Sequence, residues 1–429
     1  MTWRVWLLER VIATAVISEK ESEAEAYASL EELKSLVTTA GGTVMATTVQ
    51  NRPAPDVSTY VGKGKADEIE ALVEAWEADV VVINGELSPR QGQSLAARTS
   101  ARVIDRTQLI LDIFADRART KEGRIQVELA QLTYLLPRLR GQGHALSRLG
   151  GGIGTRGPGE TKLETDRRHI QKRMDELKKE LRRIRKHRST LRQQKERQND
   201  PQFTLVGYTN AGKTTLLNAL TNEDALAEDL LFATLDPLTR ALRLPSGLSV
   251  KISDTVGFIR GLPTTLIAAF RATLEEVSEA DVLIHVIDAT SPEAEAEKQT
   301  VMELLDELGA GDIPVITVMN KAENLDEEGV PVVNAARPRL YVSAREDQNI
   351  DELQTIMEEE LIKQMSFYSI SIPAGDGRRL YAIRHSTIVR VETFDEESEM
   401  YKLQGYAFDH HPQIAAEKQT QTDKKEDHS

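Results

Sequence analysis

A chain of 429 residues without cysteine cannot use disulfides, thiol catalysis or cysteine zinc sites, and at this length it should fold as several domains. Its formal net charge of −14 is unevenly spread, because residues 117–199 carry 23 Lys and Arg against nine Asp and Glu. No apolar run approaches the roughly 18 residues of a membrane span, and the apolar start is too short for a signal peptide, so we expect a cytoplasmic protein in which one basic segment meets a polyanion.

The first region, residues 1–116, alternates short apolar runs with helical patterns. Strands are predicted at 11–17, 43–49 and 79–85, and helices at 24–39 and 65–77. Such alternation is typical of βαβ units, so we expect a parallel α/β domain. Within it, Gly62-Lys63-Gly64-Lys65 precedes a helix and is either an anion-holding turn or a plain flexible turn.

Residues 117–199 are expected to form a helical hairpin. Apolar residues recur at spacings of three and four over 125–139 and again over 163–191, which is the pattern of two helices packed along a heptad seam. Pro137 should kink or end the first helix. Six glycines within residues 150–159 predict a mobile loop displayed between the helices.

The basic side chains crowd this loop and the second helix. A helix of one charge sign repels itself unless phosphates lie nearby, and no aromatic side chain is present to stack on single-stranded bases. We therefore expect recognition of folded RNA by shape and backbone, with a merely solvated face as the alternative. The RNA-binding candidates are Arg148, Arg156, Lys162, Arg167 and Arg168.

The segment GYTNAGKTT, residues 207–215, has the G-x-x-x-x-G-K-[ST] spacing of a P-loop, between an apolar strand and a helix. Its backbone N–H groups should hold the phosphates, with Lys213 at the β/γ-phosphates and the Thr214 hydroxyl on Mg²⁺. Further strands are predicted at 248–253, 281–287 and 313–319, as in a doubly wound sheet. The nucleotide-binding candidates in this loop are Gly207, Tyr208, Thr209, Asn210, Ala211, Gly212, Lys213, Thr214 and Thr215.

Three elements downstream have the order and spacing found in small GTP-binding proteins. In Asp254-Thr255-Val256-Gly257, the carboxylate should hold Mg²⁺ through water and the Gly257 N–H should sense the γ-phosphate. Asn320-Lys321 and Ser343-Ala344 should read the guanine base. The expected N-K-x-D has Glu323 in place of the aspartate, which moves the carboxylate by one methylene and is expected to weaken guanine preference.

Two features concern GTP hydrolysis. Phe258 follows D-T-V-G at a position that often carries a water-orienting glutamine, so the intrinsic rate should be slow unless a partner positions the water. Phe258 packing beneath the switch is compatible with this. In the preceding switch, LFATLDPLTR, both Thr234 and Thr239 are candidates to complete the Mg²⁺ and γ-phosphate site.

Nearly the whole chain resembles the HflX family of ribosome-associated GTPases. The matching segments are TYVGKGKADEIEAL, INGELSPRQ, DRTQLILDIFADRARTKEGRIQVELAQLTYLLPRLRG, LSRLGGGIGTRGPGETKLETDRR, GYTNAGKTTLLNALT, LFATLDPLTR and DTVGFIRGLP. The resemblance implies that Thr234 is the switch threonine and that phenylalanine at position 258 is usual. Glu323 and Leu149 depart from the family pattern.

The resemblance also implies partners and cofactors. Members bind the large ribosomal subunit, hydrolyse GTP when bound and split stalled ribosomes, with the glycine-rich loop reaching toward the peptidyl transferase centre. The family's N-terminal domain is linked to ATP binding, and Asn210 resembles the asparagine that coordinates an activating K⁺ in some related GTPases.

Taken together, these patterns predict four domains and a tail. They are an N-terminal parallel α/β domain (1–116), a basic helical hairpin with a glycine-rich loop (117–199), a P-loop GTPase domain (200–365), a small α+β module (366–411) and a disordered tail (412–429). In the module, strands are expected at 367–373, 387–394 and 400–408 and a helix near 377–386. His410 and His411 are expected on the surface rather than at a metal.

The predicted function is that of a monomeric, Mg²⁺-dependent GTPase, slow alone and stimulated by ribosomes, that binds GTP, GDP, the large ribosomal subunit and its ribosomal RNA. The alternatives are a nucleotide-gated ribosome-assembly or dormancy factor with incidental turnover, and an ATP-dependent RNA remodeller. The predicted catalytic residues are Lys213, Thr234 and Gly257; the Mg²⁺ ligands are Thr214, Thr234 and Asp254; the remaining nucleotide contacts are Asn320, Lys321, Glu323, Ser343 and Ala344.

Overall fold

The computed structural model describes residues 9–19, 22–139, 158–195, 200–223, 230–235, 237–261, 277–325, 333–334, 337–409, 411 and 413–414. The chain divides into two compact units. The first contains Met1–His187, Asp229–Asp236 and Arg260–Arg271, and the second contains Arg188–Glu228, Pro237–Ile259 and Ala272–Ser429. Residues 230–235 and 260–261, which lie within the predicted GTPase domain, therefore group with the N-terminal part of the chain.

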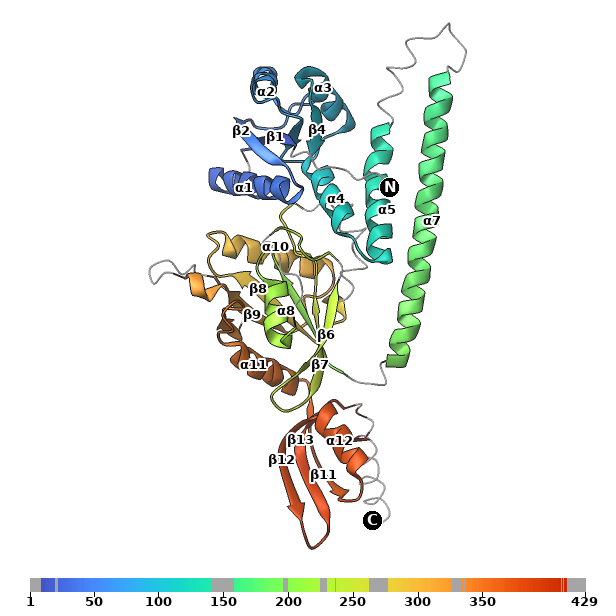
Figure 1. Cartoon of the computed structure of the whole chain (residues 1–429), viewed down its shortest axis with the longest axis vertical. Helices are drawn as coiled ribbons and strands as arrows, with labels where there is room; N and C mark the ends of the chain where they lie inside the picture. The colour runs from blue at the N-terminus through green and yellow to red at the C-terminus, as the bar shows by residue number, and fades with distance from the viewer. Residues whose placement is uncertain are drawn as a thin grey trace. The chain divides into compact units, whose positions relative to one another are not determined.

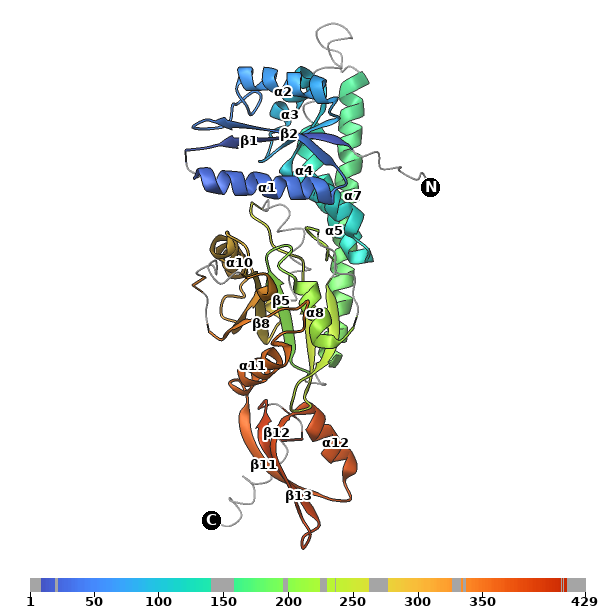
Figure 2. The same ribbon diagram turned by 60° about the vertical axis from the view of Figure 1, so that its left-hand side comes forward.

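The first unit is built on a parallel four-stranded sheet in the order β2-β1-β3-β4. Its elements are β1 (Arg10–Ile17), α1 (Glu23–Thr39), β2 (Thr43–Asn51), α2 (Lys63–Trp76), β3 (Val80–Ile83), α3 (Pro89–Thr99), β4 (Arg102–Asp105) and α4 (Arg106–Arg117). Helices α2 and α3 cover one face of the sheet, and α1 and α4 cover the other (Figure 2). The predicted parallel α/β fold is confirmed, and β4 and its flanking helices extend it.

Side-chain caps explain where the helices of this unit begin. The Ser22 side chain accepts from the Glu25 backbone N–H, and the Glu25 carboxylate accepts from the Ser22 backbone N–H. The two bonds form a capping box before α1. Ser88 and Gln91 form a second box before α3, where Pro89 occupies the first turn. Asp105 ends β4 and caps α4 through the Gln108 backbone N–H, so one residue makes a sharp strand-to-helix junction.

The predicted hairpin consists of α5 (Lys121–Arg138) and α7 (Pro158–Lys195). Their apolar seam is centred on Ile125, Leu177 and Leu181, all buried. Ion pairs from Arg173 to Glu128 and from Lys121 to Glu180 cross between the helices. Pro137 lies in the last turn of α5, one residue before its end, so it marks the end of the helix as expected.

The glycine-rich loop predicted at 150–159 lies mostly outside the described residues, since the structure does not describe 140–157. Helix α7 already begins at Pro158, two residues inside the predicted loop. Proline is favoured in the first turn of a helix because its missing N–H has no partner there. The helix start was therefore placed too late by the sequence pattern.

The second unit holds a six-stranded sheet in the order β10-β9-β8-β5-β7-β6, parallel except for β6. Its strands are β5 (Gln202–Gly207), β6 (Leu238–Arg243), β7 (Ser249–Asp254), β8 (Val282–Asp288), β9 (Val315–Asn320) and β10 (Arg339–Tyr341). The helices α8 (Lys213–Thr221), α10 (Ala294–Glu307) and α11 (Ile350–Ile362) accompany them. Because the parallel strands end at one edge, the polar residues after β5, β7 and β9 meet there, as a doubly wound sheet requires.

The C-terminal module is an antiparallel sheet in the order β11-β13-β12 with one helix packed on it (Figure 1). It contains β11 (Ser366–Pro373), α12 (Gly377–Ser386), β12 (Ile388–Asp395) and β13 (Met400–Ala407). Ile388 belongs to the hydrophobic core of the six-stranded sheet, and Arg390 pairs with the buried Glu358 of α11 at 3.4 Å. The module is thus fastened to the GTPase domain by apolar and ionic contacts.

The expectation that the histidine pair lies on the surface is wrong for His411. This residue is 4% exposed, and its Nε2 lies 2.8 Å from the Ser386 hydroxyl oxygen. No group of three or more metal-binding side chains occurs among the described residues. The other member of the pair lies outside them.

Replacing Leu177 with alanine tests the hairpin seam. Leu177 is fully buried, so Leu177→Ala should destabilise the pairing of α5 and α7 by about 2–4 kcal/mol through lost burial and a residual cavity. Amide hydrogen exchange over both helices should speed up accordingly. Lys178→Ala, at an exposed neighbouring position, is the control and should change stability by no more than about 0.5 kcal/mol. Equal exchange in the two variants would contradict the packing.

Candidate nucleotide-binding site

The P-loop connects the end of β5 to the start of α8 and depends on close backbone approaches. A Cβ at Gly207 would collide with the Val286 carbonyl oxygen of the neighbouring strand. At Gly212, the N-cap of α8, φ is +88° and a Cβ would collide with the Asn320 amide nitrogen. Only glycine fits either position, and Gly212 leaves the first N–H groups of α8 facing the loop.

Lys213 is buried at the centre of this loop. Its Nζ donates to the carbonyl oxygens of Gly207 at 3.0 Å and Tyr208 at 2.8 Å. Burial lowers the pKa of Lys213 from 10.5 to about 8, and the Asp254 carboxylate opposes this shift. A shift of this size corresponds to about 3 kcal/mol disfavouring the ammonium form. The negative charge of a bound polyphosphate would relieve that penalty.

Thr214 and Asp254 form the predicted Mg²⁺ pair. The Thr214 hydroxyl donates to Asp254 Oδ2 at 2.7 Å, and Asp254 is fully buried at the end of β7. One hydroxyl and one carboxylate at this spacing fit Mg²⁺, which prefers oxygen ligands and takes its others from phosphates and water. The residues present therefore suit the ion that the class of protein implies.

The segment after Asp254 lies directly on the P-loop. The Phe258 backbone N–H donates to the Gly207 carbonyl at 3.1 Å, and the Thr209 N–H donates to the Phe258 carbonyl at 2.8 Å. A Cβ at Gly257 would lie 2.8 Å from the Thr209 Cα and 3.2 Å from the Lys213 Nζ. Gly257 thus lies close to the groups expected to hold phosphate, where its own N–H can respond to them.

The guanine-reading loops meet at Asn320, which ends β9. Its Nδ2 donates to the Ala211 carbonyl at 2.9 Å, and its Oδ1 accepts from the Ala344 N–H at 3.1 Å. Asn320 therefore ties the P-loop to the Ser343-Ala344 loop, and its expected contact with the base stays a prediction. Lys321 pairs with Asp288 of β8 at 2.6 Å, a contact that no motif indicated.

Glu323 is the carboxylate that is expected to bind the base. Its Oε2 is buried and has no hydrogen-bond partner among the described residues. A buried carboxylate oxygen is costly to leave without a donor. The two N–H donors of guanine match this need, so the glutamate fits the role expected of the usual aspartate.

The two threonine candidates of the first switch differ in position. Thr239 lies on β6, where its hydroxyl is 2.9 Å from the Ser253 hydroxyl oxygen and is engaged in the sheet. Thr234 is partly buried and lies in Asp229–Asp236, a segment of the first unit. Thr234 as the switch threonine, which the resemblance implies, stays a prediction.

The RNA-binding candidates fall in three groups. Arg167 and Arg168 are exposed on α7. Lys162 lies in α7, but its side chain is outside the described part of the chain, and so are Arg148 and Arg156.

No helix among the described residues is long and apolar enough to cross a membrane.

The strand-end P-loop, the Thr214–Asp254 pair and the loops around Asn320 define a P-loop GTPase. Family models match in succession: GTP-binding GTPase N-terminal over 27–115, GTP-binding GTPase Middle Region over 117–195 and 50S ribosome-binding GTPase over 202–321. The chain belongs to the HflX family of GTPases, as the following relatives show.

GTPase HflX of Alkalihalophilus pseudofirmus is 50% identical over 402 residues, which cover 94% of this chain and 94% of that protein. GTPase HflX of Escherichia coli K12 is 44% identical over 359 residues, covering 81% and 83%. A GTP-binding protein from Sulfolobus solfataricus, solved in complex with GDP, is 25% identical, covers 82% of this chain and 99% of that one, and has a TM-score of 0.43. The predicted family and GTP hydrolase activity are confirmed.

Replacing Glu323 tests guanine recognition. We expect the carboxylate to accept from both N1–H and the 2-amino group of guanine, and the base of IDP lacks the latter. We expect the wild-type protein to bind GDP at least ten-fold more tightly than IDP. Glu323→Ala should reduce this ratio to near one, because the acceptor is gone, and Glu323→Asp should keep it. A ratio unchanged in Glu323→Ala, measured by calorimetric titration, would remove Glu323 from the base site.

The lowered pKa of Lys213 predicts a pH dependence of nucleotide binding. Above pH 8 the native nucleotide-free lysine is mostly neutral, whereas the unfolded lysine keeps its proton to about pH 10.5. Stability of the free protein should therefore rise with pH between about 8 and 10.5 on account of this group.

A bound diphosphate favours the ammonium, so GDP binding at pH 9 should take up protons. Titration calorimetry in two buffers of different ionisation enthalpy measures this uptake. Lys213→Arg is the control, because guanidinium stays charged and should take up none. Equal uptake by the two proteins would assign the proton to another group.

Proposed function

We propose that this GTPase binds the large ribosomal subunit through its basic hairpin and splits stalled ribosomes, with GTP-dependent order of its switches controlling the engagement. The observation that carries the proposal is the exposed basic face of α7. Arg167, Arg168, Lys178 and Lys179 are exposed and make no ion pair with any residue that the structure describes. Lys and Arg outnumber Asp and Glu along α7, and such an excess of positive charge is suited to a polyanion such as folded RNA.

The site geometry supports hydrolysis that depends on a partner. Phe258 is 2% exposed and its backbone is bonded to the P-loop, so its side chain neither reaches nor orients a water. Lys213 and the N–H groups at the start of α8 would stabilise the transferring phosphate charge. The proposed Mg²⁺, held by Thr214, Asp254 and Thr234, would neutralise charge on the phosphates. The bound subunit would supply the water-positioning group.

We also make four narrower proposals. The protein works in the cytoplasm, in association with ribosomes. Asn210, exposed in the P-loop, takes part in holding K⁺, and equal GTP hydrolysis in Na⁺ and K⁺ buffers would overturn this. ATP binding at the N-terminal domain and a monomeric state stay predictions.

Turnover by the purified protein tests the main proposal. GTP hydrolysis should be slow alone and rise at least ten-fold with large ribosomal subunits, and the stimulation should fall steeply with salt because phosphate contacts release counterions. Arg167→Glu with Arg168→Glu should weaken subunit binding by ten-fold or more. Arg378→Glu, exposed on the C-terminal module, is the control and should not.

The other outcomes separate the alternatives. No stimulation by subunits, or equal use of ATP and GTP, would overturn the proposal. If each protein molecule splits one ribosome with a non-hydrolysable GTP analogue and without GTP turnover, a binding factor would be favoured. ATP hydrolysis that survives Lys213→Ala would favour the ATP-driven remodeller.

A further inference from the structure

We propose that helix α4 couples both switch segments to the base of the basic hairpin, with Asp105, Arg106 and Phe114 as its positioning residues. Through them, the nucleotide state would set how the hairpin is held. All the contacts involved lie within the first compact unit, which contains the switch segments Asp229–Asp236 and Arg260–Arg271. The inference rests on the proposed function only for the identity of the hairpin's partner.

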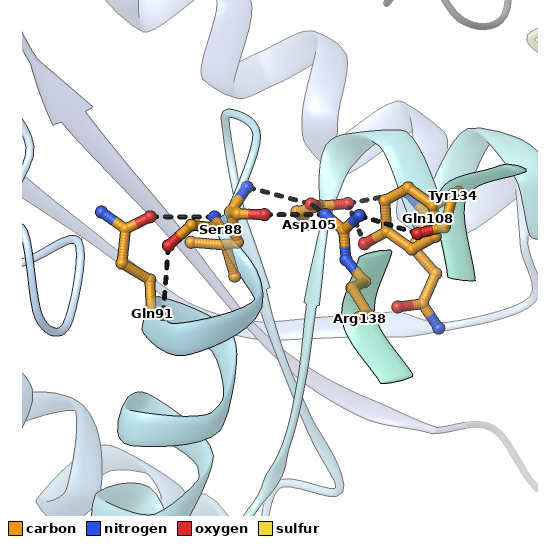
Figure 3. Close-up of polar contacts among 7 residues, drawn as sticks. Ser88, Gln91, Asp105, Gln108, Tyr134 and Arg138 are labelled. Carbon is orange, nitrogen blue, oxygen red and sulfur yellow. Dashed lines mark hydrogen bonds and ion pairs between the residues drawn. The ribbon is translucent and has the colours of Figure 1, made fainter. Parts of the chain in front are cut away.

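Asp105 holds the end of α5. This fully buried carboxylate accepts from the Tyr134 hydroxyl at 2.8 Å and from Arg138 at 3.0 Å, and from the backbone N–H groups of Leu87 and Gln108. Figure 3 shows it between the start of α3 and the side chains of Tyr134 and Arg138. Every oxygen of the carboxylate is used, so the network has one well-defined arrangement.

Arg138 strengthens this attachment from the side of α5. Its guanidinium lies 3.4 Å from the centroid of the Tyr134 ring and donates to the Leu87 carbonyl at 2.7 Å. Burial and the Asp105 charge raise the pKa of Tyr134, so its hydroxyl stays a donor. Arg138 is the last residue of α5, directly before the segment that leads into the glycine-rich loop. The network therefore fixes where that segment starts.

Arg106, the next residue, reaches the second switch. Its guanidinium donates to the Arg260 carbonyl at 3.2 Å and to Asn84 Oδ1 at 3.1 Å, and it pairs with Glu32 of α1. Arg106 is 6% exposed, and its Nε has no hydrogen-bond partner among the described residues. Moving Arg260 away would leave more of a buried cation without acceptors, which is costly.

Phe114 reaches the first switch from the same helix. Its ring meets that of Phe232 edge to face, with centroids 4.7 Å apart. Phe232 is 2% exposed and has φ of +56°, which is an unfavourable conformation for an aromatic residue. Such a conformation persists only where packing over-determines it, so the switch is held against local strain. Thr234, the candidate γ-phosphate ligand, lies two residues further on.

These three attachments sit on one short helix. Arg106 and Phe114 are eight residues apart, about 12 Å along an α-helix, and Asp105 is the N-cap. A helix of about three turns moves as one body, so pulling the switches toward a γ-phosphate would shift or release α4 and change the position of Tyr134 and Arg138. None of these side chains needs to touch nucleotide. By linkage, hairpin binding to its partner must alter GTP affinity by the same factor.

A double variant tests the coupling at Arg106. Arg106→Gln with Glu32→Gln removes the bond to Arg260 and neutralises both members of the ion pair, so no lone charge is buried. In the wild type, amide exchange over residues 134–139 should differ between the GDP-bound and GTP-analogue-bound protein, and this difference should vanish in the double variant. This readout uses no ribosome. The control is Arg102→Gln on β4, which removes an exposed ion pair between Arg102 and Glu9. This variant should keep the difference in exchange.

A second experiment measures the affinity of the protein for the large ribosomal subunit, once with bound GDP and once with the bound GTP analogue, and takes the ratio of the two affinities. The wild-type ratio should lie within the usual range of about 5–150-fold, and the double variant should bring it near one, while GDP affinity changes less than two-fold. The subunits should tighten analogue binding by the same ratio. If the double variant does not fold, Tyr134→Phe replaces it and should lower the ratio several-fold, because only one hydroxyl is lost.

The two proposals fail differently. A folded variant that keeps the wild-type exchange difference and the wild-type affinity ratio overturns the coupling through α4, while leaving ribosome binding intact. No subunit binding by the wild type overturns the proposed function instead, and the exchange measurement then still decides whether α4 couples the switches to the hairpin.

Discussion

The nucleotide site depends on burying one ammonium group inside a glycine loop. Lys213 is desolvated enough to lower its pKa to about 8, and its hydrogen bonds in this state go to carbonyl oxygens. The loop can close around it only because Gly207 and Gly212 let neighbouring backbone and Asn320 approach. A site prepared in this way is electrostatically incomplete, and a polyphosphate supplies the charge it lacks. Affinity for nucleotide therefore follows from how the fold is built, before any base-specific contact is counted.

The same loop is already in contact with the element that must respond to GTP. The Thr209 N–H belongs to the P-loop but donates to the Phe258 carbonyl. Because an N–H group has one hydrogen to give, a phosphate oxygen that takes it must displace the Phe258 backbone. Arg260 follows two residues later and is bonded to Arg106 in the first unit. A phosphate and the Phe258 carbonyl would thus compete for the same N–H group, and phosphate binding there would release the second switch.

Sequence reasoning succeeded where function depends on short-range spacing. The P-loop, D-T-V-G and N-K-A-E were readable because each places its groups within a few residues, and strand–helix alternation was enough to predict both parallel sheets. It failed where a side chain acts through distant partners. Asp288, which pairs with Lys321, belongs to no motif, and the sequence pattern assigned no role to Asp105 and Arg106, which lie at the end of the four-residue strand β4 and the start of α4. The bonds of Asn320 to Ala211 and Ala344 could not be predicted for the same reason, since both partners lie far away in sequence.

The contrast between the two ends of the coupling suggests its direction. Around Asp105, both carboxylate oxygens accept two hydrogen bonds each. Rearranging this network would therefore not lower its free energy. At the nucleotide site, the buried ammonium of Lys213 and the buried Glu323 oxygen would both be stabilised by a ligand. Free energy to change the structure is therefore available at the nucleotide site and absent at the hairpin base. The hairpin would be moved by the switches through α4, and RNA binding would act back on the switches only by the reciprocal amount.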